Sequence, residues 1–245
     1  MQSKKEKSLV RTDLAVERTA GVPKFPGVHQ KKRGEVFTVT EIQIENDTCG
    51  ASIGKPAGRY VTLEAQELSR SCENYSKMAE ELAQELMAFL PKEGCVFVAG
   101  LGNRAVTPDA LGPRVASKVL ATRHLKNALT EEELAALPEL RSVCVLAGGV
   151  LGETGMESAE LMHAVCKQVR PCAVVSIDAL ACAELSRLGT TIQMCDSGIS
   201  PGSGVANHRR ELSKKTLGVP VIALGVPTVV DLHTAVQCIY GRRVP

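Results

Sequence analysis

The sequence predicts an α/β fold, in which helices flank a mostly parallel sheet and an antiparallel pair of strands precedes it near the N-terminus. Four short segments, CVFVAG, VCVLAG, CAVVSI and VPVIALG, are almost continuously apolar, as is typical of strands covered by helices on both faces. Helical patterns alternate with these segments along the chain. Two earlier segments instead alternate polar and apolar residues, which predicts strands with one exposed face.

The first 33 residues are distinct in charge. They hold nine Lys or Arg against three acids, whereas the rest of the chain holds 20 against 24. Pro23 and Pro26 indicate that residues 18–34 form an irregular, exposed connection. A basic arm can bind nucleic acid, but no aromatic side chain precedes Phe25 and the chain has no Trp for base stacking. We therefore expect no direct nucleic-acid partner.

The antiparallel pair is predicted at 36–44 and 58–65, which are rich in β-branched residues. Residues 66–90 space their apolar side chains as one face of a helix, and Pro91 ends it. The expected elements that follow are strand 94–100, helix 109–127, strand 142–148, helix 156–169, strand 172–178, a short helix near 180–187, strands 190–195 and 219–225, and a last helix at 229–240.

Composition narrows the function classes. With 245 residues, 44% of them apolar, and a net charge of +2, the chain is expected to be one soluble globular domain. No apolar run approaches the ~20 residues of a membrane span and no secretory signal is recognisable, so we expect a cytoplasmic protein without a membrane partner. The nine cysteines include no Cys-x-x-Cys pair and are interpreted as reduced core residues. No metal or other cofactor is expected.

The segment Gly100-Leu-Gly102-Asn-Arg-Ala105 formally fits a dinucleotide-binding pattern. The helix is expected to start only at Pro108, however, and no acidic residue ends the next strand to bind a ribose. A nucleotide site is therefore not favoured.

Two acidic residues are the strongest catalytic candidates. Asp109 follows the strand at 94–100, and Asp178 ends the strand at 172–178. The carboxyl ends of parallel strands meet at one edge of a sheet, so both carboxylates are expected in one crevice. Such a pair favours acid/base hydrolysis, with one aspartate activating water and the other donating a proton. By position, Asp109 is assigned as the base and Asp178 as the acid, although the sequence alone does not decide this order.

Backbone donors that could stabilise an oxyanion are expected in two loops. One contains Gly102 and Asn103. The other is the glycine-rich segment CDSGISPGSG, with candidate oxyanion or substrate-binding residues Asp196, Gly198, Gly202 and Gly204. A cysteine mechanism fits less well, because no cysteine stands out as exposed beside a histidine.

Seven blocks in one order resemble a known family. They are RTDLAVE (11–17), GRYVTLEA (58–65), GLGN with VTPDALGP (100–113), TGMESAE (154–160), IDALA (177–181), DSGISPGSGV (196–205) and RRELSKKTLGVPVIALGVPTVVD (209–231). They resemble the germination proteases of endospore-forming bacteria, which start the digestion of the small acid-soluble proteins that coat spore DNA. The resemblance implies a phosphorylase/hydrolase-like three-layer fold, similar to that of hydrogenase maturation endopeptidases.

The resemblance also implies a zymogen that cuts itself between Asp13 and Leu14. The chain would then consist of a basic pro-segment (1–13) and a single peptidase domain (14–245), without the C-terminal extension of many family members. The two essential aspartates of the family fall on Asp109 and Asp178. The resemblance further implies a homotetramer in the spore core with small acid-soluble spore proteins as substrates.

Two alternatives stay open at this point. The first is a metal-sensing maturation endopeptidase of the same fold, which would use Asp109 and another acid around nickel. The second is a catalytically silent binding or assembly protein, although the presence of both aspartates argues against it.

Overall fold

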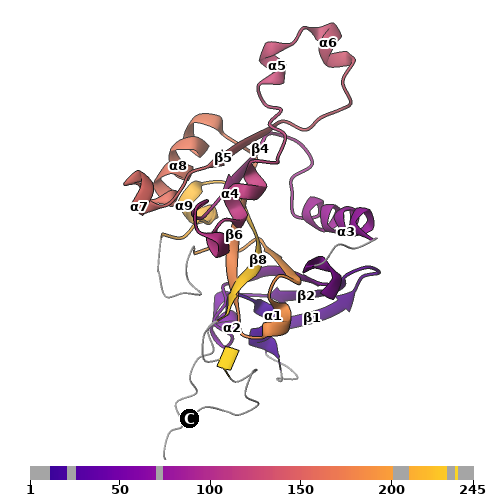
Figure 1. Ribbon diagram of the computed structural model, residues 1–245, viewed down its shortest axis with the longest axis vertical. Helices are drawn as coiled ribbons and strands as arrows, with labels where there is room; N and C mark the ends of the chain where they lie inside the picture. Colours follow the sequence, from indigo (N-terminus) through magenta and orange to yellow (C-terminus); the bar gives the residue numbers. More distant parts are fainter. Residues whose placement is uncertain (1–11, 21–25, 70–73, 201–209, 231–234, 237–245) are drawn as a thin grey trace, which may run out of the picture.

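A mixed sheet of eight strands forms the centre of the computed structural model, which describes residues 12–20, 26–69, 74–200, 210–230 and 235–236 (Figure 1). The strand order is β1-β2-β3-β7-β8-β6-β4-β5. The parallel part consists of β4 (Val96–Gly100), β5 (Val143–Ala147), β6 (Ala173–Cys182) and β8 (Val221–Val230). The α/β class predicted from the apolar segments is confirmed.

The antiparallel part is larger than predicted. It consists of β1 (Val28–Arg33), β2 (Thr38–Ile44), β3 (Gly58–Glu64) and β7 (Thr191–Cys195), and β7 joins the two parts by pairing antiparallel to both β3 and β8. The expected pair at 36–44 and 58–65 corresponds to β2 and β3.

The prediction of an irregular connection over 18–34 is wrong for most of its described residues, since β1 and the end of α1 (Ala15–Thr19) lie there. The four central residues of β1 are exposed and polar, so no alternating pattern marks it. It is a strand because it pairs with the outer edge of β2, and its lysines suit an exposed edge.

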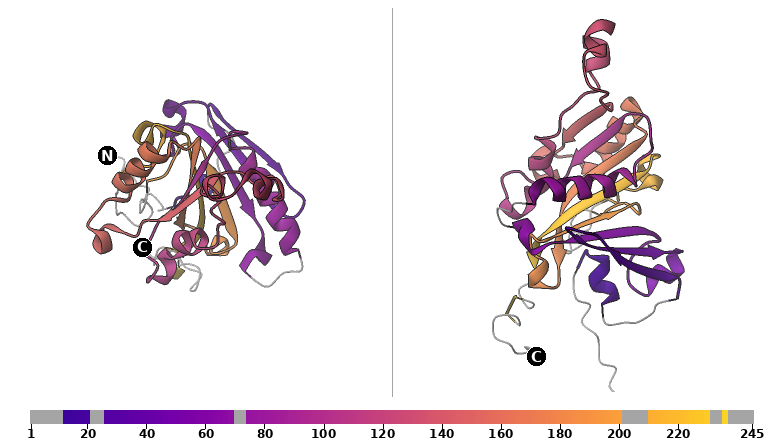
Figure 2. Two further views of the ribbon diagram at one scale, coloured as in Figure 1. Left: turned by 90° about the horizontal axis from the view of Figure 1, so that it is seen from above. Right: turned by 90° about the vertical axis from the view of Figure 1, so that its right-hand side faces the viewer.

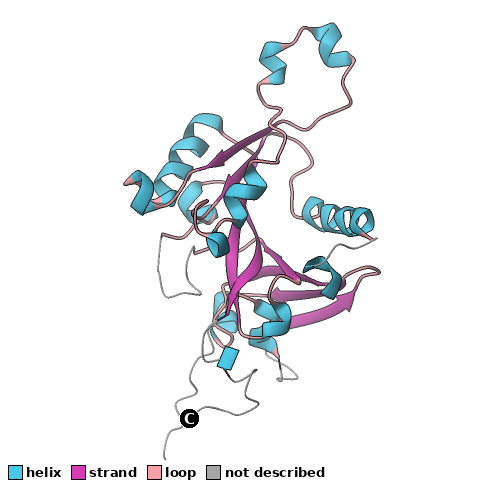
Figure 3. Cartoon of the chain, viewed as in Figure 1, coloured by secondary structure: helices cyan, strands magenta, loops and turns pink. Residues whose placement is uncertain are grey.

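Helices cover both faces of the sheet, as Figures 2 and 3 show. On one face, α3 (Tyr75–Met87) and α4 (Leu111–Ala116) lie over apolar side chains of the sheet such as Val61, Val98 and Ile177. The other face carries α1, α8 (Ser158–Val169) and α9 (Lys214–Leu217). Shorter elements are α2 (Asp47–Ala51), η1 (Gln66–Ser69), α7 (Leu151–Thr154) and η3 (Leu185–Arg187).

The predicted helix over 109–127 is broken into η2 (Thr107–Asp109), α4 and α5 (Leu125–Ala128). Between α4 and α5 the backbone N–H groups of Thr122 and Arg123 both donate to the carbonyl of Val143, which draws the chain out of the helix. The connection then projects beyond the sheet with α5 and α6 (Glu131–Ala135) at its tip (Figure 1).

Two expectations near the end of the chain are corrected. The short helix near 180–187 is replaced by the end of β6 and by η3, because Ala181 and Cys182 pair with Val229 and Val230 of β8. The start of the last helix, at 229–230, is strand, and most of residues 231–240 lie outside the described part. Within the described residues, no helix is long and apolar enough to cross a bilayer.

Candidate active site

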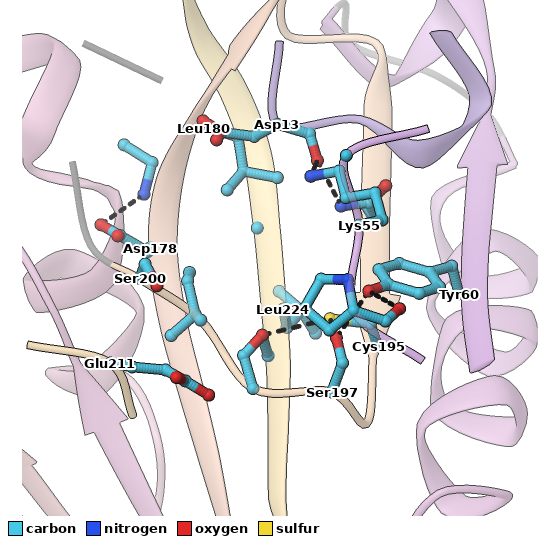
Figure 4. A pocket seen from close by; sticks show the side chains of 18 residues that line it. Asp13, Lys55, Tyr60, Asp178, Leu180, Cys195, Ser197, Ser200, Glu211 and Leu224 are labelled. Atoms are coloured by element: carbon cyan, nitrogen blue, oxygen red, sulfur yellow. Dashed lines mark hydrogen bonds between the residues drawn. The ribbon is translucent and has the colours of Figure 1, made fainter. Parts of the chain in front are cut away.

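Asp178 lies inside β6 rather than at its end. It is opposite Gly225 of β8, and only 5% of its surface is exposed. Side chains alternate along a strand, so Asp178 shares a face with Leu180, and both line a pocket of about 240 Å³ (Figure 4). One carboxylate oxygen accepts a hydrogen bond from the N–H of Ala179 at 2.8 Å. A buried carboxylate therefore faces an open space that a substrate could enter.

Asp109 ends η2, in the connection that leaves β4. Its Oδ2 accepts a hydrogen bond from the N–H of Asn103 at 2.7 Å. Gly102 makes this fold of the loop possible, because its φ is +110° and a Cβ there would lie 2.1 Å from the carbonyl oxygen of Asp109. The position of Asp109 therefore depends on Gly102, because any other residue there would force the Asp109 backbone to move.

Asp178 lies in β6, and Asp109 lies in the connection that leaves the neighbouring strand β4. Gly100 at the end of β4 pairs with Ile177 of β6, and the N–H of Leu101 donates to the Ile177 carbonyl at 2.8 Å. The chain toward Asp109 thus leaves the sheet at the level of Asp178, and η2 contacts both β6 and β8. Asp109 itself is not among the residues that line the pocket with Asp178.

The pocket also contains the residue before the expected cleavage bond. Asp13 lines it and lies against the end of β6, where its N–H donates to the Ala181 carbonyl at 2.9 Å. The Ala181 N–H in turn donates to Oδ2 of Asp13 at 2.8 Å. Leu14 and Ala15, at the start of α1, are fully buried in an apolar cluster with residues of β2 and β6. The chain on both sides of the Asp13–Leu14 bond is therefore held in a defined position.

Two side chains converge on the carbonyl oxygen of Asp13. Lys55 donates to it from Nζ at 2.6 Å, and Gln193 of β7 donates from Nε2 at 3.0 Å. Burial lowers the pKa of Lys55, and the charge of Asp13 partly opposes that effect. Figure 4 shows Lys55 beside Asp13 on one side of the pocket, with Asp178 on the other.

Sequence reasoning missed both of these residues. The only sequence signal for Gln193 is its position as a polar residue within the apolar strand TIQMC, since a buried amide needs partners. Lys55 lies in a loop without any recognisable motif. Glu211, a third carboxylate of the pocket, was also missed.

Only some of the predicted oxyanion and substrate-binding residues line the pocket. Gly198 lines the pocket, whereas Asp196 accepts a hydrogen bond from the N–H of Arg59 at 2.8 Å and so helps to join β7 to β3. The N–H of Asn103 is directed at Asp109 and not at the pocket's open space. Gly202 and Gly204 lie outside the described residues.

The cysteines that the structure describes are all free thiols. Cys195 lines the pocket, and burial raises its pKa. Among the described residues, no three His, Cys, Asp or Glu side chains are grouped in a way that could hold a metal ion.

Comparisons with known proteins agree with the sequence blocks. The family model described as germination protease matches residues 10–239. Germination protease from Caldanaerobacter subterraneus subsp. tengcongensis is 46% identical over 234 residues, which covers 92% of this chain and 70% of that protein. The Clostridium tetani protein of the same name is 44% identical over 237 residues, covering 92% and 72%. Among solved structures, the [NiFe] hydrogenase maturation protease HycI from Thermococcus kodakarensis KOD1 matches with a TM-score of 0.36 and 21% identity, over 58% of this chain and 80% of that one.

Proposed function

The chain belongs to the germination protease family, and from this premise we propose that it is an endopeptidase that starts the degradation of small acid-soluble spore proteins during germination. Family membership supports a protease role and favours this function over a metal-sensing maturation peptidase. The proposed place of action is the spore core, and the proposed assembly is a homotetramer.

We further propose that the protein is made as a zymogen that cuts itself between Asp13 and Leu14. The observation that carries this proposal is the shared pocket, because Asp13 and the buried carboxylate of Asp178 both line it. A peptide bond held beside a catalytic group gains much of its rate from proximity. Residues 1–13 would be released as the pro-segment.

In the proposed mechanism, Asp178 and Asp109 act as the acid/base pair. The ionised aspartate takes a proton from a water molecule, whose oxygen attacks the carbonyl carbon of Asp13. The protonated aspartate gives its proton to the leaving nitrogen of Leu14 as the C–N bond breaks. The products are a carboxyl group on residue 13 and an amine on residue 14, and no covalent intermediate forms.

The contacts of the processing segment also suggest how a spore-protein substrate would be recognised. An acidic residue before the cut would accept the Ala181 N–H as Asp13 does, near the charge of Lys55. Leu14 and Ala15, after the cut, pack among apolar residues. The expected substrate sequence is thus an acidic residue, then an apolar residue, then alanine.

The test is cleavage of a purified small acid-soluble spore protein, with product masses determined by mass spectrometry. We expect cuts that follow an acidic residue and precede an apolar residue and alanine. An intact substrate after incubation with folded protein would contradict the proposal and favour a silent binding protein.

A further inference from the structure

We infer that Lys55 and Gln193 are the oxyanion-binding residues for hydrolysis of the Asp13–Leu14 bond, an inference that rests on the proposed self-cleavage. Attack of water on the Asp13 carbonyl carbon would place a negative charge on the oxygen that both side chains already contact. These catalytic residues differ from the glycine-rich backbone donors expected from the sequence.

The geometry is that of an oxyanion hole. Lys55 Nζ and Gln193 Nε2 lie 2.6 Å and 3.0 Å from the Asp13 carbonyl oxygen. Donors at about 2.7–3.1 Å from a developing oxyanion, in a site that excludes water, stabilise the transition state strongly. Lys55 comes from the loop before β3 and Gln193 from β7, and both reach the same oxygen.

The neighbouring peptide fixes the orientation of the Gln193 amide. The N–H of Ala15 donates to Oε1 of Gln193 at 2.6 Å, and a backbone N–H can only donate. The amide oxygen must therefore face Ala15, which directs Nε2 toward the carbonyl of Asp13. One glutamine thus holds the backbone on both sides of Leu14.

The backbone of Lys55 is fixed by the turn that carries it. Its N–H donates to the Gly50 carbonyl at 3.1 Å. A Cβ at Gly50 would lie 2.0 Å from the Lys55 carbonyl oxygen, so only glycine allows this close turn. The turn therefore holds Lys55 at the pocket before the Asp13–Leu14 bond is attacked.

The lowered pKa of Lys55 agrees with a role in the transition state. A neutral carbonyl compensates only part of the cost of burying an ammonium group, whereas an oxyanion would compensate more of it. The interaction would therefore be stronger in the transition state than in the ground state, which is the requirement for rate acceleration. The charged or titratable groups that act on Lys55 are Asp13, Cys195, Arg18 and Glu17.

The test follows self-cleavage by intact mass after cell-free synthesis of the full chain. Lys55→Met removes the donor and keeps the apolar stem, while Gln193→Glu keeps the size and the acceptor for Ala15. Loss of one oxyanion donor slows such reactions by about 100-fold or more, and we expect this for each variant. Lys55→Arg should recover part of the rate. Lys77→Met, a change of an exposed lysine on α3, is the matched control and should cut normally.

Hydrogen exchange at the amides of Leu14 and Ala15 distinguishes catalysis from simple anchoring. We expect both amides to stay protected in Lys55→Met while cleavage is slow. Cleavage at the wild-type rate in both variants would overturn the inference but not the proposed self-cleavage. Slow cleavage together with loss of protection at the Leu14 and Ala15 amides would also overturn the inference, because the side chains would then only anchor the segment. A wild-type chain that never cuts itself would contradict the proposed self-cleavage, and the inference with it.

Discussion

Replacement of Gly102 by alanine tests how Asp109 is placed. The added Cβ would lie 2.1 Å from the carbonyl oxygen of Asp109 and 2.9 Å from its Oδ1. The first of these atoms belongs to the backbone, so a side-chain rotation cannot relieve the contact. The η2 turn would have to move away from its present position.

The size of the effect follows from these distances. Cβ contacts below 3.0 Å essentially do not occur, so the Asp109 segment would retreat by about 1 Å. A displacement of about 1 Å in a catalytic constellation costs about 100-fold in rate. Because φ of Gly102 is positive, alanine there should also lower the free energy of unfolding by about 1–2 kcal/mol.

The assay measures the rate of self-cleavage and the unfolding midpoint in denaturant. Gly155→Ala is the matched control, because Gly155 also has a positive φ, +69°, but a Cβ there meets no atom within 4 Å. We expect both variants to lose some stability and only Gly102→Ala to lose activity. A folded Gly102→Ala protein that cuts itself at the wild-type rate would refute the reasoning.

Three further predictions concern buried groups. Leu14→Ala should lower the free energy of unfolding by about 2–5 kcal/mol in chemical denaturation, whereas alanine at the exposed Leu120 should change it little. Burial raises the pKa of Cys166 and of Cys182 to about 11, so iodoacetamide at neutral pH should leave both unmodified in the native protein, as checked by peptide mass spectrometry; rapid labelling would contradict their burial. Folding lowers the pKa of Lys55, so at pH values between the lowered pKa and the ordinary lysine value of 10.5 the unfolded state binds more protons than the folded state. The wild type should therefore gain stability relative to Lys55→Met as the pH rises through that range. A stability difference that does not change with pH would contradict the lowered pKa.

The parallel strands could be predicted from the sequence because their burial on both faces leaves long apolar runs. Asp109 and Asp178 were chosen as candidates for a related reason, since each follows or interrupts such a run; their catalytic role stays a prediction, and only Asp178 lines the pocket. This signal is local in the sequence, because every parallel strand that is covered by helices on both faces needs such an apolar run.

Other parts depend on tertiary contacts that no local pattern records. β1 is a strand because β2 offers it an edge, although its own residues are polar. Lys55 and Gln193 lie 42 and 180 positions from Asp13 in the sequence, and only the folded sheet brings them to its carbonyl oxygen. The extension of β6 beyond Asp178 likewise follows from its pairing with β8.

The most direct test of the aspartate pair is the intact mass of the full chain, followed over time for the wild type, Asp109→Asn, Asp178→Asn and Glu211→Gln. Glu211 lines the same pocket as Asp178 and is proposed to have no part in the pair, so its variant is the matched control. The account predicts that the wild type and Glu211→Gln lose residues 1–13, while both folded aspartate variants keep their full mass. Loss of the same segment at the wild-type rate in either aspartate variant would contradict it.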